Sequence, residues 1–166
     1  GQQFPLSGVV EGVTYDAEPR GDFGEGIFIP DEQGPCFSTS LTLTSFAPGA
    51  VVEDAFTDIE SVFVNMEHSW MADLTIDLIC PNGSTMQLQS QGGGGTNLGV
   101  PVTDLISLVN PGIGFDYFWS PVATNGTWTE EAGGFVTLPS GIYSAFGSWN
   151  SMEGCPLNGT WEIEIC

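Results

Sequence analysis

Positively charged residues are almost absent from this sequence. Arg20 is the single Lys or Arg against 21 Asp and Glu residues, and the formal net charge is −20 at pH 7. Nucleic acids and anionic membrane surfaces bind proteins through Lys and Arg, so this composition excludes both as partners. The excess of carboxylates favours solubility in salt and attracts divalent cations.

Long apolar segments are missing as well. No run of about 18 apolar residues occurs, which excludes an inserted transmembrane helix. No segment shows a convincing helical periodicity of apolar residues either. The sequence therefore predicts a protein with no membrane insertion and no helices.

Histidine occurs once, at His68. A Ser-His-Asp or Cys-His catalytic system needs that histidine beside a nucleophile. Ser69 and Asp73 are close to it in sequence, but closeness along a strand and its loop does not produce triad geometry. We therefore predict a structural role for His68 and no enzymatic activity.

Cysteine occurs four times, at positions 36, 80, 155 and 166. This spacing fits neither a zinc ribbon nor a redox pair, so it predicts two disulfide bonds in an exported protein. Three connectivities can form. Cys80 and Cys155 each precede a proline at a predicted strand edge, which favours Cys80–Cys155 together with Cys36–Cys166.

Apolar and polar residues alternate in several stretches, as is typical of strands with one buried face. The clearest stretch is 61–90, where three alternating runs are separated by turn residues. Asn82 and Gly83 tolerate the positive φ of a tight turn, so the second and third runs should form an antiparallel hairpin. The apolar positions of the three runs are Val62, Val64, Met66, Leu74, Ile76, Leu78, Cys80, Met86 and Leu88.

Further strands are predicted on both sides of this stretch. Residues 37–46 and 161–166 alternate in the same way, and short strands should flank the Pro139–Gly141 turn. The glycines at 92–95 predict a loop, because a phosphate-binding loop would need a following Lys and a helix start. Residues 101–127 show no regular pattern.

A set of short motifs in this order resembles the P domain, or homo B domain, of subtilisin-like proprotein convertases. The central motifs are His-Ser-Trp-Met-Ala-Asp-Leu at 68–74 and Cys-Pro-Asn-Gly-Ser at 80–84. The resemblance implies an all-β jelly-roll β-sandwich of two antiparallel sheets, similar to galactose-binding folds, without catalytic residues. It spans residues 27–166 and leaves 1–26 as an N-terminal extension with one or two short strands, a possible donor or edge strand. The remaining motifs are Ile29-Pro30-Asp31, Thr57-Asp58-Ile59, Gly92 to Leu98, Leu138-Pro139-Ser140-Gly141 and Asn158-Gly159-Thr160-Trp161.

Acidic residues in predicted loops indicate a structural calcium site. Calcium binds about six to eight oxygen ligands from carboxylates, carbonyls and water on irregular backbone. The candidate ligands are Asp31, Asp54, Asp58 and Asp116, and no EF-hand spacing occurs. The resemblance also implies calcium, because related jelly-roll modules often hold it.

Aromatic residues gather in the segment without regular pattern. An apolar aromatic face suits the face of a sugar ring, so Tyr117, Trp119 and the more distant Trp149 are candidate ligand-binding residues for a glycan. The alternative is that these side chains cover the hydrophobic core.

Three functions follow from these observations. Our leading hypothesis is a non-enzymatic extracellular structural or adhesive module, similar to modules in secreted surface proteins of Bacteroidetes-type bacteria. The alternatives are a carbohydrate-binding module and an accessory domain processed from a secreted subtilisin-like protease.

Self-association is a further expectation. The resembled family continues past the Asn-Gly-Thr-Trp strand with one more strand, whereas this sequence ends at Cys166. A sandwich without its last strand would carry an open edge, and residues 3–15 could be donated to that edge in the next subunit, building a filament. The alternatives are that the last strand was removed, or that the extension folds back on its own domain.

Overall fold

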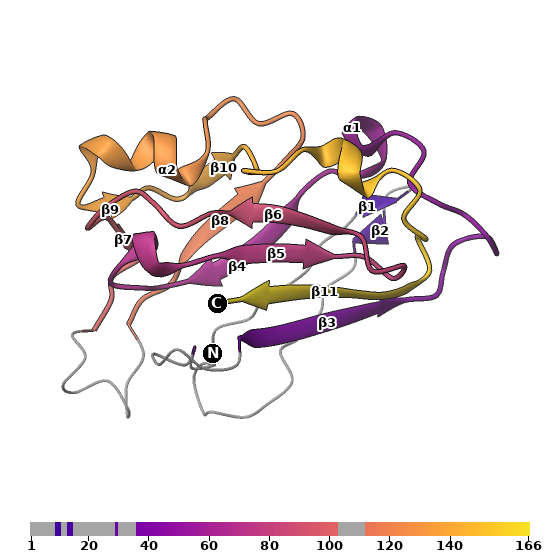
Figure 1. Ribbon diagram of the computed structural model, residues 1–166, viewed down its shortest axis with the longest axis horizontal. Helices are drawn as coiled ribbons and strands as arrows, with labels where there is room; N and C mark the ends of the chain where they lie inside the picture. Colours follow the sequence, from indigo (N-terminus) through magenta and orange to yellow (C-terminus); the bar gives the residue numbers. More distant parts are fainter. Residues whose placement is uncertain (1–8, 11–12, 15–28, 30–35, 103–111) are drawn as a thin grey trace.

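The computed structural model describes residues 9–10, 13–14, 29, 36–102 and 112–166 (Figure 1). Within these residues the chain is all-β, and two larger sheets contain most of the strands. In Figure 1 the four-stranded sheet lies in front of the three-stranded sheet. The apolar side chains on the buried faces of both sheets belong to one core, which is the arrangement expected of a β-sandwich.

The four-stranded sheet is antiparallel throughout. Its order is β3 (Phe37–Leu43), β11 (Gly159–Ile165), β5 (Ile76–Ile79) and β6 (Thr85–Gln89). The other sheet is mixed, because β8 runs antiparallel to β4 but parallel to β10. Its order is β10 (Gly141–Tyr143), β8 (Phe115–Trp119) and β4 (Val62–Met66).

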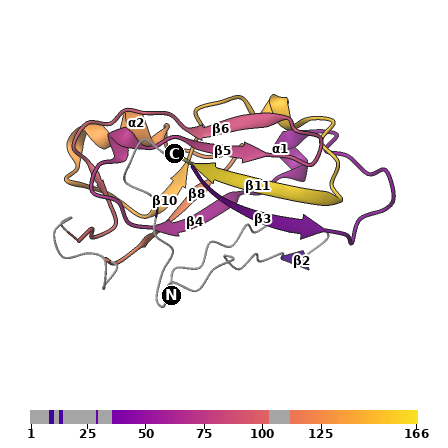
Figure 2. The ribbon, with the colours of Figure 1, turned by 60° about the horizontal axis from the view of Figure 1, so that its bottom comes forward.

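The remaining described strands form two small sheets. One is the antiparallel pair β1 (Val9–Val10) and β2 (Val13–Thr14), and the other is the parallel pair β7 (Asn97–Leu98) and β9 (Thr137–Leu138). The helices are short: α1 (Ala55–Asp58), α2 (Trp128–Glu131) and 3₁₀ turns η1 (Met71–Asp73), η2 (Ala132–Gly134) and η3 (Trp149–Met152). Helices α1 and α2 lie at opposite ends of the long axis (Figures 1 and 2). None of the helices in the described part of the chain has the length and apolar character needed to cross a membrane.

The alternating runs of the sequence became strands with the predicted faces inward. On β4, every second residue is buried, and the same holds for β5. The predicted hairpin is confirmed, since β5 and β6 pair across a turn at 81–84 in which Gly83 has a φ of +87°. The side chain of Asn82 stabilises this turn by accepting a hydrogen bond from the Ser84 backbone N–H at 2.9 Å.

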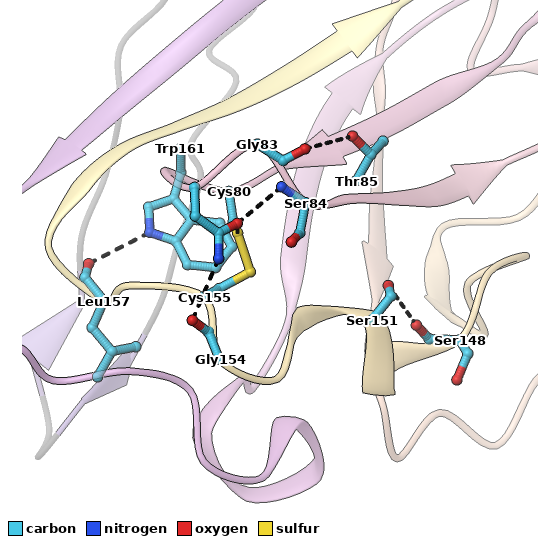
Figure 3. Close-up of a disulfide and its surroundings, with 11 residues drawn as sticks. Cys80, Gly83, Ser84, Thr85, Ser148, Ser151, Gly154, Cys155, Leu157 and Trp161 are labelled. Atoms are coloured by element: carbon cyan, nitrogen blue, oxygen red, sulfur yellow. Dashed lines mark hydrogen bonds between the residues drawn. A yellow bond between two sulfur atoms is a disulfide. The ribbon is translucent and has the colours of Figure 1, made fainter.

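Both predicted disulfide bonds are present. Cys36–Cys166 joins the chain just before β3 to the chain just after β11, and Cys80–Cys155 joins the end of β5 to the loop before β11 (Figure 3). Trp161, on β11, donates from its indole N–H to the Leu157 carbonyl at 3.4 Å in the same region. The disulfides therefore tie together segments that are far apart in sequence.

The predicted loop at the glycines is present, and it is built on positive φ angles. Gly92, Gly93 and Gly94 have φ values of +147°, +86° and +61°. At Gly93 a Cβ would also collide with the methyl group of Met71 and touch Ala132, so the position needs glycine for space as well as for conformation.

Two features of the fold differ from the prediction. Strand β8 lies in the segment that showed no regular pattern. Four of its five residues are aromatic, with only Asp116 between them, and this nearly continuous run hides the period of two. Helices α1 and α2 contain four residues each, which is too short to show helical periodicity.

The edges of the larger sheets are β3, β6, β4 and β10. Figure 2 shows β3 and β4 at the rims of their layers. Strand β11 has neighbours on both sides and is not an open edge. The predicted donor segment 3–15 lies mostly outside the described residues, and within it β1 and β2 pair with each other, so strand donation stays a prediction.

Candidate functional site

The single histidine holds a turn. The Trp70 backbone N–H donates to Nδ1 of His68 at 3.2 Å, and the His68 backbone pairs with Leu98. None of the hydrogen bonds that His68 makes within the described part of the chain reaches a serine, cysteine or aspartate side chain. This arrangement fits the structural role that the sequence predicted.

Two of the candidate calcium ligands share the turn that begins α1. Asp54 is the N-cap residue and accepts from the Phe56 N–H at 2.9 Å. The carboxylate of Asp58 accepts from the backbone N–H groups of Asp54 at 3.2 Å and Glu53 at 2.8 Å. These backbone hydrogen bonds, from Asp54 and then Glu53, hold the pKa of Asp58 below its usual value. Both carboxylates therefore already stabilise the backbone of this turn.

The other two candidates are not brought to this turn. Asp116 lies on β8 and accepts from Nδ2 of Asn65 on β4 at 2.7 Å, while Asp31 lies outside the described residues. Within the described ranges, the one group of three potential metal ligands is Cys36, Cys166 and Glu164, whose two sulfurs are committed to a disulfide. For the calcium prediction, the described part of the chain thus offers two carboxylates in one turn and no assembled ligand set.

The three candidate sugar-binding aromatics are core residues. Tyr117 and Trp119 are fully buried, and Trp149 is buried as well. Trp119 stacks on Trp128 with ring centroids 4.5 Å apart, and Trp128 packs edge-on against Tyr117 at 5.0 Å. A sugar cannot reach these ring faces in the folded domain, so the ligand-binding assignment is corrected to the alternative, a role in the core.

The hydroxyl group of Tyr117 is also fully used. It donates to the Leu138 carbonyl at 2.9 Å and accepts from the Gly99 backbone N–H at 2.8 Å. Burial raises the pKa of Tyr117 to about 12, so the phenol stays protonated at any physiological pH. This side chain joins β8 to β9 and to the segment after β7.

A row of apolar side chains crosses the outer face of the three-stranded sheet. Phe118, in the central strand β8, is the register partner of Phe63 on β4 and of Ile142 on β10. The rings of Phe63 and Phe118 lie 4.7 Å apart between centroids, and Ile142 is 51% exposed. We call these three residues the apolar row. Phe63 and Phe118 are partly exposed, so the three side chains form a short apolar strip across this face.

The outer face of the four-stranded sheet has the opposite character. Glu162 and Glu164 alternate with inward residues on β11, and Glu164 is the register partner of Asp77 on β5. Burial and, second, the charge of Glu164 raise the pKa of Asp77 above its usual value. Among the described residues, this outer face therefore carries carboxylates where the other face carries the apolar row.

The apolar row could have been noticed in the sequence. Phe63 occupies an outward position of an alternating run, where a polar residue is the ordinary choice. Phe118 lies between two other aromatic residues, Tyr117 and Trp119, so the sequence alone does not show that it points outward while they point into the core. The pairing with Ile142 needed the structure, because it depends on a parallel strand contact across the sheet.

These features define a disulfide-linked β-sandwich domain with one apolar outer face. Residues 59–166, more than half of the chain, match the proprotein convertase P-domain family, and the chain belongs to that family. P domains are non-catalytic accessory domains of subtilisin-like proteases, and membership is compatible with a secreted protein. Comparison with curated proteins and with solved structures gives no significant match.

Proposed function

We propose that this chain is a non-catalytic accessory domain of an exported subtilisin-like protease, which it stabilises by packing against the protease domain. The family match over residues 59–166 carries the proposal. The two disulfide bonds support an oxidising, extracellular location, because the cytosol keeps thiols reduced. This function replaces the adhesive or filament-forming role as our leading hypothesis, since the family match gives that role no support.

We further propose the jelly-roll connectivity of the family for this chain. The pairing of β3 with β11 supports it, because strands far apart in sequence become neighbours in Greek-key and jelly-roll sandwiches.

The apolar row is the surface that we assign to the protease domain. Phe63 and Phe118 already pack on each other, so little side-chain freedom would be lost on binding. Ile142 extends the row to the edge strand β10, and Asp116 with Asn65 forms a polar border on the same face. An apolar centre with a polar rim is the usual anatomy of a protein interface.

The precursor and one charged substitution test this function. We expect the precursor to encode a subtilisin-like domain with Asp, His and Ser motifs. Adding the wild-type chain to that domain should raise the midpoint of its thermal unfolding by several degrees, as any partner that binds only the folded state does. Ile142→Asp should remove most of the shift, because it places a charge in the apolar row.

Phe56→Asp is the matched control, since Phe56 is 49% exposed on α1 and lies outside the row. It should leave the shift unchanged. A precursor without a protease domain would contradict the proposed function. A shift that Ile142→Asp and Phe56→Asp reduce equally would contradict the assigned surface.

Calcium binding stays a prediction, now focused on the turn that contains Asp54 and Asp58. If calcium binds there, EDTA should lower the midpoint of thermal unfolding by several degrees, and excess calcium should restore it. Asp116→Asn, on β8, should respond to EDTA like the wild type if the ion occupies this turn. A midpoint that EDTA does not move would rule out a structural calcium ion.

A further inference from the structure

A hollow with one exposed tryptophan opens beside strands β7 and β9. Its volume is about 400 Å³, within the range of about 300–1,000 Å³ typical of small-molecule sites. Trp70, Pro101 and Val102 supply apolar walls. Ser69, Asn97 and Thr137 supply polar side chains. The hollow shares no residue with the apolar row.

Hydrogen bonds on both sides of Trp70 hold its backbone in place. The turn before it is held by His68, as described above, and the next residue, Met71, donates its N–H to the Thr96 carbonyl at 3.0 Å. A Cβ added to Gly95 would lie 3.5 Å from Cζ3 of the indole, so the backbone of Gly95 flanks the ring. The indole is nevertheless 55% exposed, which leaves much of its surface available to a ligand.

Among the described residues, the polar side chains of the hollow have no hydrogen-bond partner. Asn97 and Thr137 are register partners on β7 and β9, and Ser69 precedes Trp70. All three are partly buried, yet their side chains make no hydrogen bond with any other described residue. A hydroxyl and an amide that are partly shielded from solvent and unpaired are well suited to bind a polar ligand.

We propose that this hollow binds a neutral oligosaccharide, with one sugar ring against the indole of Trp70. The apolar face of a pyranose suits an indole, and the three polar side chains offer both donors and acceptors to its hydroxyl groups. The formal net charge of −20 favours a neutral sugar over an acidic one, because the overall field repels carboxylates and sulfates. A domain with this site would hold a protease near a glycan-bearing substrate or surface.

A glycan array followed by calorimetry tests the proposal on the intact chain. The probes are neutral gluco-, manno-, xylo- and chito-oligosaccharides. We expect saturable binding to at least one series, weakened at least about tenfold by Trp70→Ala because the buried aromatic contact is lost. Thr137→Val, which removes a hydroxyl at nearly constant volume, should weaken binding several-fold.

Phe56→Ala is the matched control, because Phe56 is an exposed aromatic on α1. Helix α1 lies at the other end of the molecule from β7 and β9, beside which the hollow opens (Figure 1). It should bind as the wild type does. Absence of binding to all four series at millimolar concentration would overturn the proposal, and so would wild-type affinity in Trp70→Ala. If Trp70→Ala instead weakens only the contact with the protease domain, the hollow belongs to a protein interface and the sugar site is excluded.

Discussion

Trp119→Ala should lower the free energy of unfolding by about 3–5 kcal/mol, the usual range for removing a buried tryptophan. Trp119 is fully buried and stacks on Trp128 at 4.5 Å, so alanine would leave a cavity between the two layers. Its indole N–H has no hydrogen-bond partner among the described residues, so the loss comes from packing rather than from a polar contact. Urea unfolding followed by circular dichroism measures the change.

Trp70→Ala provides the comparison for this experiment. Its side chain is 55% exposed, and substitutions at such surface positions usually change stability by about 0.5 kcal/mol or less. The two tryptophan variants should therefore differ by several-fold in their effect. Equal stability of Trp119→Ala and the wild type would show that Trp119 is not part of the core.

Removing the Cys36–Cys166 disulfide should cost about 3–5 kcal/mol of stability. The bond joins residues 130 positions apart, so its loss frees a very long loop in the unfolded chain. Cys36 and Cys166 are both exposed in the folded domain, and serine at these positions therefore adds no buried polar group. The double variant Cys36→Ser with Cys166→Ser measures the chain-entropy effect with little interference from packing.

The second disulfide offers a contrast. Cys80 and Cys155 are buried, so replacing both with serine should cost more than the loop entropy alone, because two hydroxyl groups enter the core. Guanidinium unfolding of both double variants under oxidising conditions compares the two bonds. An unchanged midpoint in the Cys36→Ser, Cys166→Ser variant would mean that the unfolded chain gains no freedom without this bond.

Local patterns in the sequence predicted the larger part of the fold. The β5–β6 hairpin followed from alternation and from the Asn82-Gly83 turn, which act over a few residues. The disulfide pairing followed from the similar surroundings of Cys80 and Cys155. Strand β8 did not follow, because its aromatic residues face both the core and the outside, and composition does not distinguish these directions.

The candidate sites were harder to predict, for two physical reasons. An aromatic side chain can pack in the core or lie exposed to a ligand, and the sequence does not show which. Trp119 and Trp70 differ in burial, since the first is buried and the second is exposed. A carboxylate can bind a metal ion or accept a hydrogen bond from a backbone N–H. Asp54 and Asp58 already accept such backbone hydrogen bonds. Both choices depend on neighbours that the sequence does not place.

The position of β11 has a consequence for the order of folding. This strand lies between β3 and β5, yet it is synthesised after both of them. During synthesis the sheet therefore lacks its centre, and folding has to wait for contacts across most of the chain, which makes it slow. Ile165 pairs with Phe37 at the end of the β3–β11 ladder, next to the Cys36–Cys166 bond, so the disulfide fixes in place the pairing that forms across most of the chain.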